Sequence, residues 1–183
     1  CRLPGLAAST TLTSETDMHG RPFGLLHWPY ADLYSVVLST SPAGFAGLDK
    51  TVRDSQVAHW AAWLGSLNTI EEIVGAAVVV ETIPDSGQRL ERAMERGRAQ
   101  DESVPDFAAA VEQQIRDTYR VGSPTLTCRV TLTLTARVEE VDSDGSKTWV
   151  RSRAEMAEQI GDLLPSWTGS LAATGAGTAV RPC

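Results

Sequence analysis

The chain contains few of the residues from which metal and catalytic sites are commonly built. Its 183 residues include only three cysteines and three histidines. The cysteines are Cys1, Cys128 and Cys183, an odd number with two at the chain ends, which gives neither a disulfide framework nor a zinc-ligand spacing. The histidines at positions 19, 27 and 59 have no second histidine, cysteine or acid at a spacing suited to a metal. We therefore expect no metal ion and no cofactor.

Positive charge and long apolar runs are scarce as well. Lys and Arg number 16 against 23 Asp and Glu, so the formal net charge is −7 and direct binding to nucleic acid is not expected. No stretch approaches the roughly 18 to 20 consecutive apolar residues that a membrane-spanning helix needs. The apolar content of 42% is nevertheless ordinary for a globular domain. We expect residues 1–183 to form a single domain, with an irregular lead-in over residues 1–18 that contains a short strand near Leu12.

Several common catalytic and ligand-binding motifs are missing or incomplete. The chain has no G-x-S-x-G sequence and no cysteine with a credible histidine partner. Gly175-Ala176-Gly177 lacks both the Lys-Ser/Thr pair of a phosphate-binding loop and the third glycine of a dinucleotide-binding loop. Asp142 begins an acidic stretch like the start of a calcium loop, but the twelfth position is Arg153, where calcium needs a bidentate Glu. These absences favour a protein that is not an enzyme.

Hydrophobic patterns in the first half of the chain predict a hairpin, a helix and a strand. Residues 23–28 and 33–39 are short apolar runs separated by a turn sequence, which indicates a hairpin. Residues 51–67 carry Trp60 and Trp63 at helical spacing, which predicts a helix whose indoles belong to the core. Residues 74–83 form a nearly continuous apolar run, which favours a central strand covered on both faces.

The second half predicts two further helices, a long strand, a hairpin and a last helix. Helices are expected over residues 85–98 and 103–119. Residues 125–138 alternate strictly between apolar and polar positions, which indicates a strand with one face in the core. A hairpin follows around Asp144-Gly145. Ser152 and Glu155 form the capping-box pattern of the last helix, which Pro165 should kink or divide into two abutting helices. A short strand is expected near residues 178–181.

These elements predict an α+β fold. We expect a two-layer sandwich in which a mixed, mostly antiparallel sheet carries helices packed on one face.

Two groups of residues are candidates for an interaction surface. Thr131 and Thr133 line the polar face of the alternating strand. This face is polar enough to be exposed to solvent and flat enough to bind a partner. Trp28 and Trp149 lie at strand ends near turns, where an exposed indole can anchor a partner.

A local basic cluster is the third candidate, and two interpretations of it stay open. Its members are Arg89, Arg92, Arg96 and Arg98. They alternate with Glu91 and Glu95, which is typical of a solvated helix face with intrahelical ion pairs. The functional interpretation is a surface for an acidic partner or for anionic lipid headgroups.

Several collinear segments give the chain a family resemblance. They are GRPFGLLHWPYADLYSVVL, VAHWAAWLGSL, GAAVVVETIPDSGQRL, EMAEQIGDLLP and LAATGAG. In this order and spacing they resemble the soluble region of a family of actinobacterial membrane proteins that are encoded in conjugative or integrative elements, beside conjugation ATPases. The family is similar in layout to EccE, a component of the type VII secretion translocon. The resemblance runs from about Leu6 to Pro182, and it departs around residues 96–103 and 139–147.

The resemblance implies a scaffold and brings no catalytic residues. It implies a membrane anchor before Cys1, a soluble domain that continues past Cys183 and faces the cytoplasm, and a non-enzymatic assembly role in a conjugation or secretion complex. The expected partners are other subunits of that complex. Two alternatives stay open. One is a degenerate or unrecognised transferase-like domain that binds a small anionic ligand beside residues 89–98. The other is an exported lipoprotein whose lipidated residue is Cys1.

Overall fold

A computed structural model describes residues 5–42, 47–84, 107, 110, 111, 114, 124–142, 145–177 and 180–183. The chain divides into two compact units, one of Cys1–Val80 with Cys128–Cys183 and one of Glu81–Thr127. Most of the described residues belong to the first unit. The helices predicted over residues 85–98 and 103–119 lie outside the described residues, apart from positions 107, 110, 111 and 114, which are helical.

The described strands form a main antiparallel sheet and a separate hairpin. In chain order the elements are η1 (Gly5–Ser9), β1 (Thr11–Thr16), β2 (Pro22–Trp28), β3 (Leu33–Thr40), α1 (Lys50–Leu67), β4 (Ile73–Pro84), β5 (Pro124–Thr135), β6 (Arg137–Asp142), β7 (Gly145–Val150), α4 (Arg153–Leu171), η2 (Ala172–Ala176) and β8 (Arg181–Pro182). The main sheet has the order β1-β2-β3-β5-β4, and β8 also pairs with β3. Strands β6 and β7 pair only with each other among the described strands. The predicted hairpins are confirmed as β2–β3 and β6–β7.

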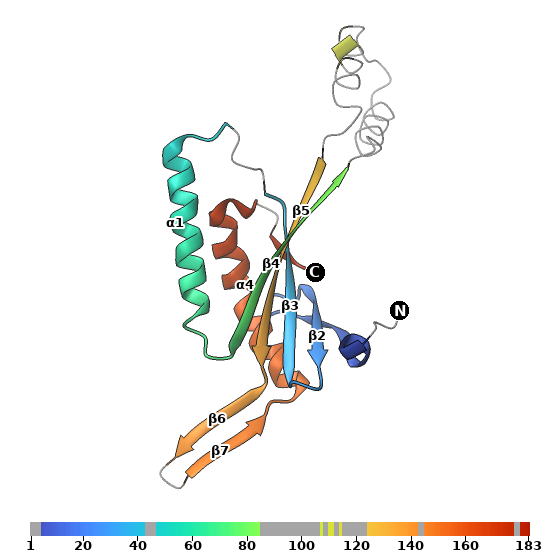
Figure 1. Ribbon diagram of the computed structural model, residues 1–183, viewed down its shortest axis with the longest axis vertical. Helices are drawn as coiled ribbons and strands as arrows, with labels where there is room; N and C mark the ends of the chain where they lie inside the picture. Colours follow the sequence, from blue (N-terminus) through green and yellow to red (C-terminus); the bar gives the residue numbers. More distant parts are fainter. Residues whose placement is uncertain are drawn as a thin grey trace. The chain divides into compact units, whose positions relative to one another are not determined.

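Helices α1 and α4 pack on one face of the main sheet, which confirms the α+β prediction (Figure 1). The core lies between these layers, and β3 contributes Tyr34, Val36 and Leu38 to it. Its neighbour β5 contributes the aligned even positions from Val130 to Leu134, because the register places Tyr34 opposite Leu134 and Leu38 opposite Val130. The one-sided burial predicted from the alternation in β5 is therefore confirmed. It ends towards the start of the strand, where Leu126 is 45% exposed.

Strand β4 corrects one expectation. The apolar run was predicted to be central and covered on both faces, but β4 stands at one end of the described sheet, beside β5 alone. Ile73 packs against the core, whereas Val78 is 48% and Val80 is 59% exposed. On the helix side, α1 packs against α4 and η2 and leaves Val79 53% exposed, whereas Val78 and Val80 lie on the opposite face, which neither α1 nor α4 covers. An apolar run without periodicity therefore does not establish that both faces of the strand are covered.

Helix α1 is attached to the core by its second half. Trp63 is 2% exposed, stacks on Trp60 with the ring centroids 5.2 Å apart, and donates from Nε1 to the carbonyl oxygen of Trp167 at 3.4 Å. Trp167 is itself 3% exposed and lies on α4. The prediction that these indoles belong to the core is confirmed, with Trp60 partly buried at its margin. The other buried residue of α1 is Leu67, so much of the helix surface faces solvent.

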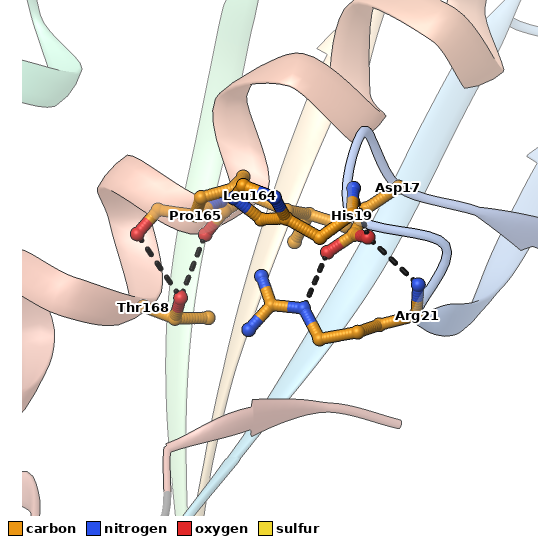
Figure 2. A network of polar contacts seen from close by, with 6 residues as sticks. All are labelled: Asp17, His19, Arg21, Leu164, Pro165 and Thr168. Atoms are coloured by element: carbon orange, nitrogen blue, oxygen red, sulfur yellow. Dashed lines mark hydrogen bonds and ion pairs between the residues drawn. The ribbon is translucent and has the colours of Figure 1, made fainter.

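Helix α4 begins at the predicted capping box and is continuous through its proline. Ser152 Oγ accepts from the Glu155 backbone N–H at 3.3 Å, and Glu155 Oε2 accepts from the Ser152 N–H at 2.6 Å. Pro165 lies inside the helix and supplies no N–H to the carbonyl one turn earlier. Thr168 Oγ1 donates to the carbonyl oxygens of Leu164 and Pro165 at 2.9 and 3.2 Å (Figure 2). Because the helix runs unbroken to Leu171, the alternative of two abutting helices is wrong.

A buried carboxylate organises the turn between β1 and β2. Asp17 has no exposed side-chain surface and accepts from the backbone N–H groups of His19 and Arg21 at 2.9 and 2.8 Å, and from Arg21 Nε at 2.7 Å (Figure 2). Helix α4 approaches this turn closely at Gly161, where a Cβ atom would lie 3.3 Å from the Cα atom of Asp17. Burial by itself raises the pKa of Asp17, but the hydrogen bonds from Arg21 and His19 outweigh it, so the pKa lies below its ordinary value of 3.8.

The lowered pKa of Asp17 predicts an acid-dependent loss of stability. The ionised carboxylate is favoured by folding, so its contribution is complete well above pH 3.8 and declines as the pH falls below that value. We expect wild type to melt above Asp17→Asn at neutral pH, and the difference between their melting temperatures to shrink in acid. Thermal unfolding followed by circular dichroism between about pH 7 and about pH 2.5 measures it. A difference that is independent of pH would contradict the ionic role of Asp17.

Candidate interaction surface

The candidate surface is the face of the main sheet opposite α1 and α4, here called the open face. On β3 the alternate positions Ser35, Val37 and Ser39 point away from the core, since their neighbours Val36 and Leu38 are buried in it. The pairing registers continue this face into rows across neighbouring strands. Leu26, Ser35 and Thr133 form one row, Val37 and Thr131 the next, and Ser39 and Arg129 the third.

The structure joins two of the predicted surface residues through a hydroxyl group. Trp28 Nε1 donates to Ser35 Oγ at 3.2 Å, and Ser35 Oγ lies 2.9 Å from Thr133 Oγ1. Ser35 is 3% exposed, while Trp28 and Thr133 are half-buried. Thr131 lies two residues from Thr133 on the same face and is also half-buried. The indole N–H is therefore held within the sheet, which fixes the ring of Trp28 in place.

Sequence reasoning missed Ser35, although a signal for it was present. The register of the predicted hairpin places Trp28 opposite Leu33 and Leu26 opposite Ser35, on the polar parity of the strand. A serine at such a position between two apolar neighbours is a candidate for a cross-strand hydroxyl contact.

A shallow groove lies on the open face where the chain end meets the sheet. Its volume is about 930 Å³, and its lining includes Leu12, Leu26, Val37 and Pro182. The last residues enter between β2 and β3: Gly24 N donates to the Cys183 carbonyl oxygen at 2.6 Å, and Cys183 N donates to the Val37 oxygen at 2.9 Å. The short strand predicted near residues 178–181 is confirmed in part, as the two-residue β8.

Two guanidinium groups stand beside this groove. The registers of β5 and β8 place Arg129 and Arg181 on opposite sides of Ser39, in one row across three strands, and both side chains line the groove. No Asp or Glu lines it among the described residues. The groove thus combines an apolar floor with local positive charge in a chain whose formal net charge is −7. No local sequence signal connects these residues, because they are distant in the chain.

The remaining candidates lie apart from this arrangement. Trp149 is 45% exposed and belongs to β7, in the separate two-stranded sheet, opposite Val138. Its hairpin extends beyond the end of β5 (Figure 1). The predicted basic cluster of Arg89, Arg92, Arg96 and Arg98 lies outside the described residues.

The shifted carboxylates of the described residues serve ion pairs and caps. Burial raises the pKa of Glu72, but hydrogen bonds from its own backbone N–H, from Gln159 and from Arg151 outweigh it, so the pKa is lowered. Its Oε1 lies 3.0 Å from Arg151 Nη1. The Ser152 N–H lowers the pKa of Glu155, and that of Asp17 is lowered too. A carboxyl group that acts as a general acid near neutral pH needs a raised pKa, so these three are unsuited to that role.

The described part of the chain offers neither a metal site nor a membrane-spanning helix. No cluster of three or more His, Cys, Asp or Glu residues there could hold a metal ion. None of its helices is long and apolar enough to span a membrane.

No protein-family model, curated protein or solved structure matches this chain. The comparisons therefore supply neither a family nor a fold relative.

Proposed function

We propose that this chain is a non-enzymatic assembly subunit of a conjugative-transfer or secretion membrane complex, and that it acts by protein–protein contacts. The observation that carries the proposal is the open face. It is broad and built from short hydroxyl and aliphatic side chains, and Arg129 is the charged residue in its β3–β5 rows. Apart from Arg129, a partner can cover such a face without burying an unpaired charge.

The hydroxyl chain of the open face supports a docking role. Ser35 is already satisfied by Trp28 and Thr133, so a partner that covers this region does not leave its hydroxyl without a hydrogen bond. The rigid indole of Trp28 then offers an aromatic contact at little entropic cost. We place the binding energy mainly in Trp28, Val37 and the neighbouring threonines.

The sequence resemblance supplies the setting of this proposal. It suggests that the protein is anchored in the inner (cytoplasmic) membrane through a segment outside residues 1–183, with this domain on the cytoplasmic side. Its partners are then other subunits of the complex, with no direct contact to nucleic acid.

A charged substitution on the open face tests the proposal. Arginine at both Thr131 and Thr133 would test the whole strand, but Thr133 holds Ser35, so Thr131→Arg is the cleaner variant. We expect it to fold with a melting temperature close to wild type and to lose at least about tenfold in partner affinity, which corresponds to about 1.4 kcal/mol. Co-purification from gently solubilised membranes, quantified by mass spectrometry, measures that loss.

The matched control is Thr51→Arg, which adds the same charge at an exposed threonine of α1. It should assemble like wild type. If Thr131→Arg assembles normally, the open face is excluded as the contact.

A second candidate function rests on the groove. The guanidinium groups of Arg129 and Arg181 beside an apolar floor suit a small anionic ligand, as a degenerate or unrecognised transferase-like domain would bind. Saturable thermal stabilisation by a nucleotide or sugar nucleotide, lost in Arg181→Gln, would favour this function over the assembly role.

A further inference from the structure

The outer edge of β4 is the most unusual surface of the first unit. Among the described strands it has a neighbour on one side only. Its exposed valines are Val74 at 54%, Val78 at 48%, Val79 at 53% and Val80 at 59%. Residues 73–80 contain neither a charge nor a proline. Natural proteins normally blunt a sheet edge with such residues, because a long, uncharged edge is a template for another strand.

The alternation of β4 determines which side chains share a face. Ile73 packs against the core, so Ala77 and Val79 lie on the helix side of the sheet. Val74, Val78 and Val80 lie on the open face. The hydrogen bond from Thr135 N to the Glu72 carbonyl at 2.8 Å joins the end of β5 to the start of β4, so the two strands are antiparallel. The other edge of β4 points away from β5.

We propose that a second copy of this chain covers the edge, with β4 pairing antiparallel to its own copy about a twofold axis at Ala77. In this register Ala77 faces Ala77 of the other copy and Val74 faces Val80. The inner pairs place a small residue opposite a large one, since Gly75 faces Val79 and Ala76 faces Val78. Every pair keeps its side chains on one face, so two sheets join into one continuous sheet.

Charge is the reason to assign a second copy to this edge. No carboxylate falls within residues 74–80, so the register sets no like charges opposite each other. Glu71 and Glu72 precede this stretch and Glu81 follows it, and the register sets them opposite Ile83, Thr82 and Ile73. Glu72 is also engaged by Arg151 at 3.0 Å. The edge is therefore self-complementary without a partner of opposite charge, as an isologous interface requires. This inference stands independently of the proposed function.

A cysteine at the twofold axis tests the register. In a background with Cys1, Cys128 and Cys183 changed to alanine, Ala77→Cys should form a disulfide-linked dimer under mild oxidation. Directly opposed residues of an antiparallel pair have Cα atoms about 4.5 to 5.5 Å apart, within the range of a disulfide. The control is Ala76→Cys, whose copy lies diagonally at about 7 to 8 Å and should crosslink much less. Equal crosslinking of both variants would overturn the register.

A lysine at the twofold axis tests the interface without a covalent crosslink. Sedimentation velocity at about 100 µM protein should give a dimer for wild type and a monomer for Ala77→Lys, which opposes two like charges. Val57→Lys should remain dimeric. Val57 is as exposed as the valines of β4, but it lies on α1, outside the proposed interface. A monomeric wild type, or a dimer that survives Ala77→Lys, would overturn the proposal. If the edge instead pairs with a strand of another protein, the isolated wild type should be monomeric.

Discussion

Trp63→Ala is expected to lower the free energy of unfolding by about 3 to 5 kcal/mol, which is a large part of the stability of a domain. Trp63 is 2% exposed, and α1 has only one other buried residue, Leu67. The truncation removes the stack on Trp60 and the hydrogen bond to the Trp167 carbonyl and leaves a cavity between the helices. We expect α1 to detach from α4 before the sheet unfolds.

The measurement is guanidinium denaturation followed by far-ultraviolet circular dichroism, which does not depend on the deleted indole. Leu64→Ala is the matched control, because Leu64 is the next residue of the same helix but is 43% exposed. Its cost should be below about 1 kcal/mol. If the two variants lost similar stability, Trp63 would not be the anchor of α1.

Gly177→Ala should cost about 2 to 3 kcal/mol or more. Gly177 has φ 92° and ψ 164°, a combination that is essentially restricted to glycine. A Cβ atom there would also overlap the backbone carbonyl of Ser41. This carbonyl belongs to the segment after β3 whose Ser41 N–H donates to Ala176 at 2.9 Å, so neither backbone can move away freely.

Gly65→Ala is expected to raise the stability of the protein, whereas Gly177→Ala lowers it. Gly65 lies inside α1, and a Cβ atom built on it meets nothing within 4 Å. Alanine should therefore stabilise the protein by about 1 kcal/mol through helix propensity. Thermal unfolding of both variants tests the pair. Equal shifts of the same sign would show that the backbone around Gly177 is not constrained as described.

The parts of the fold that were predictable from the sequence carry local signals. The β2–β3 hairpin has apolar runs on both sides of a turn, and β5 alternates so strictly that its buried face could be named. The start of α4 followed from Ser152 and Glu155, which make both bonds of the capping box. In each case the physical cause lies within a few neighbouring residues.

The position of β4 could not be predicted in the same way. Its apolar run reports hydrophobicity, but coverage depends on where α1 packs. Trp63 and Leu67 are the buried residues of α1, which packs against α4, and Val79 is left exposed on the helix side of β4. A helix that was bound to the sheet along its whole length would have buried Val79, but it would not have covered the valines of the open face. The tertiary arrangement therefore decided what the sequence pattern could not.

The candidate surface was predictable only in part. Thr131 and Thr133 were expected on the polar side of β5, and the register sets them opposite Val37 and Ser35 on the open face. Their link to Trp28 through Ser35 follows from pairing between two hairpin strands and a distant strand. The row of Arg129, Ser39 and Arg181 depends on β8, which pairs with a strand about 140 residues earlier in the chain.

The most direct test of the assembly role is to identify the proteins that co-purify with the native protein. The protein is tagged in its source organism, extracted from gently solubilised membranes and analysed by mass spectrometry, beside the Thr131→Arg and Thr51→Arg variants. We predict that wild type and Thr51→Arg recover conjugation or secretion ATPases together with membrane subunits, and that Thr131→Arg does not. Recovery of the protein without any such subunit would contradict the proposed function.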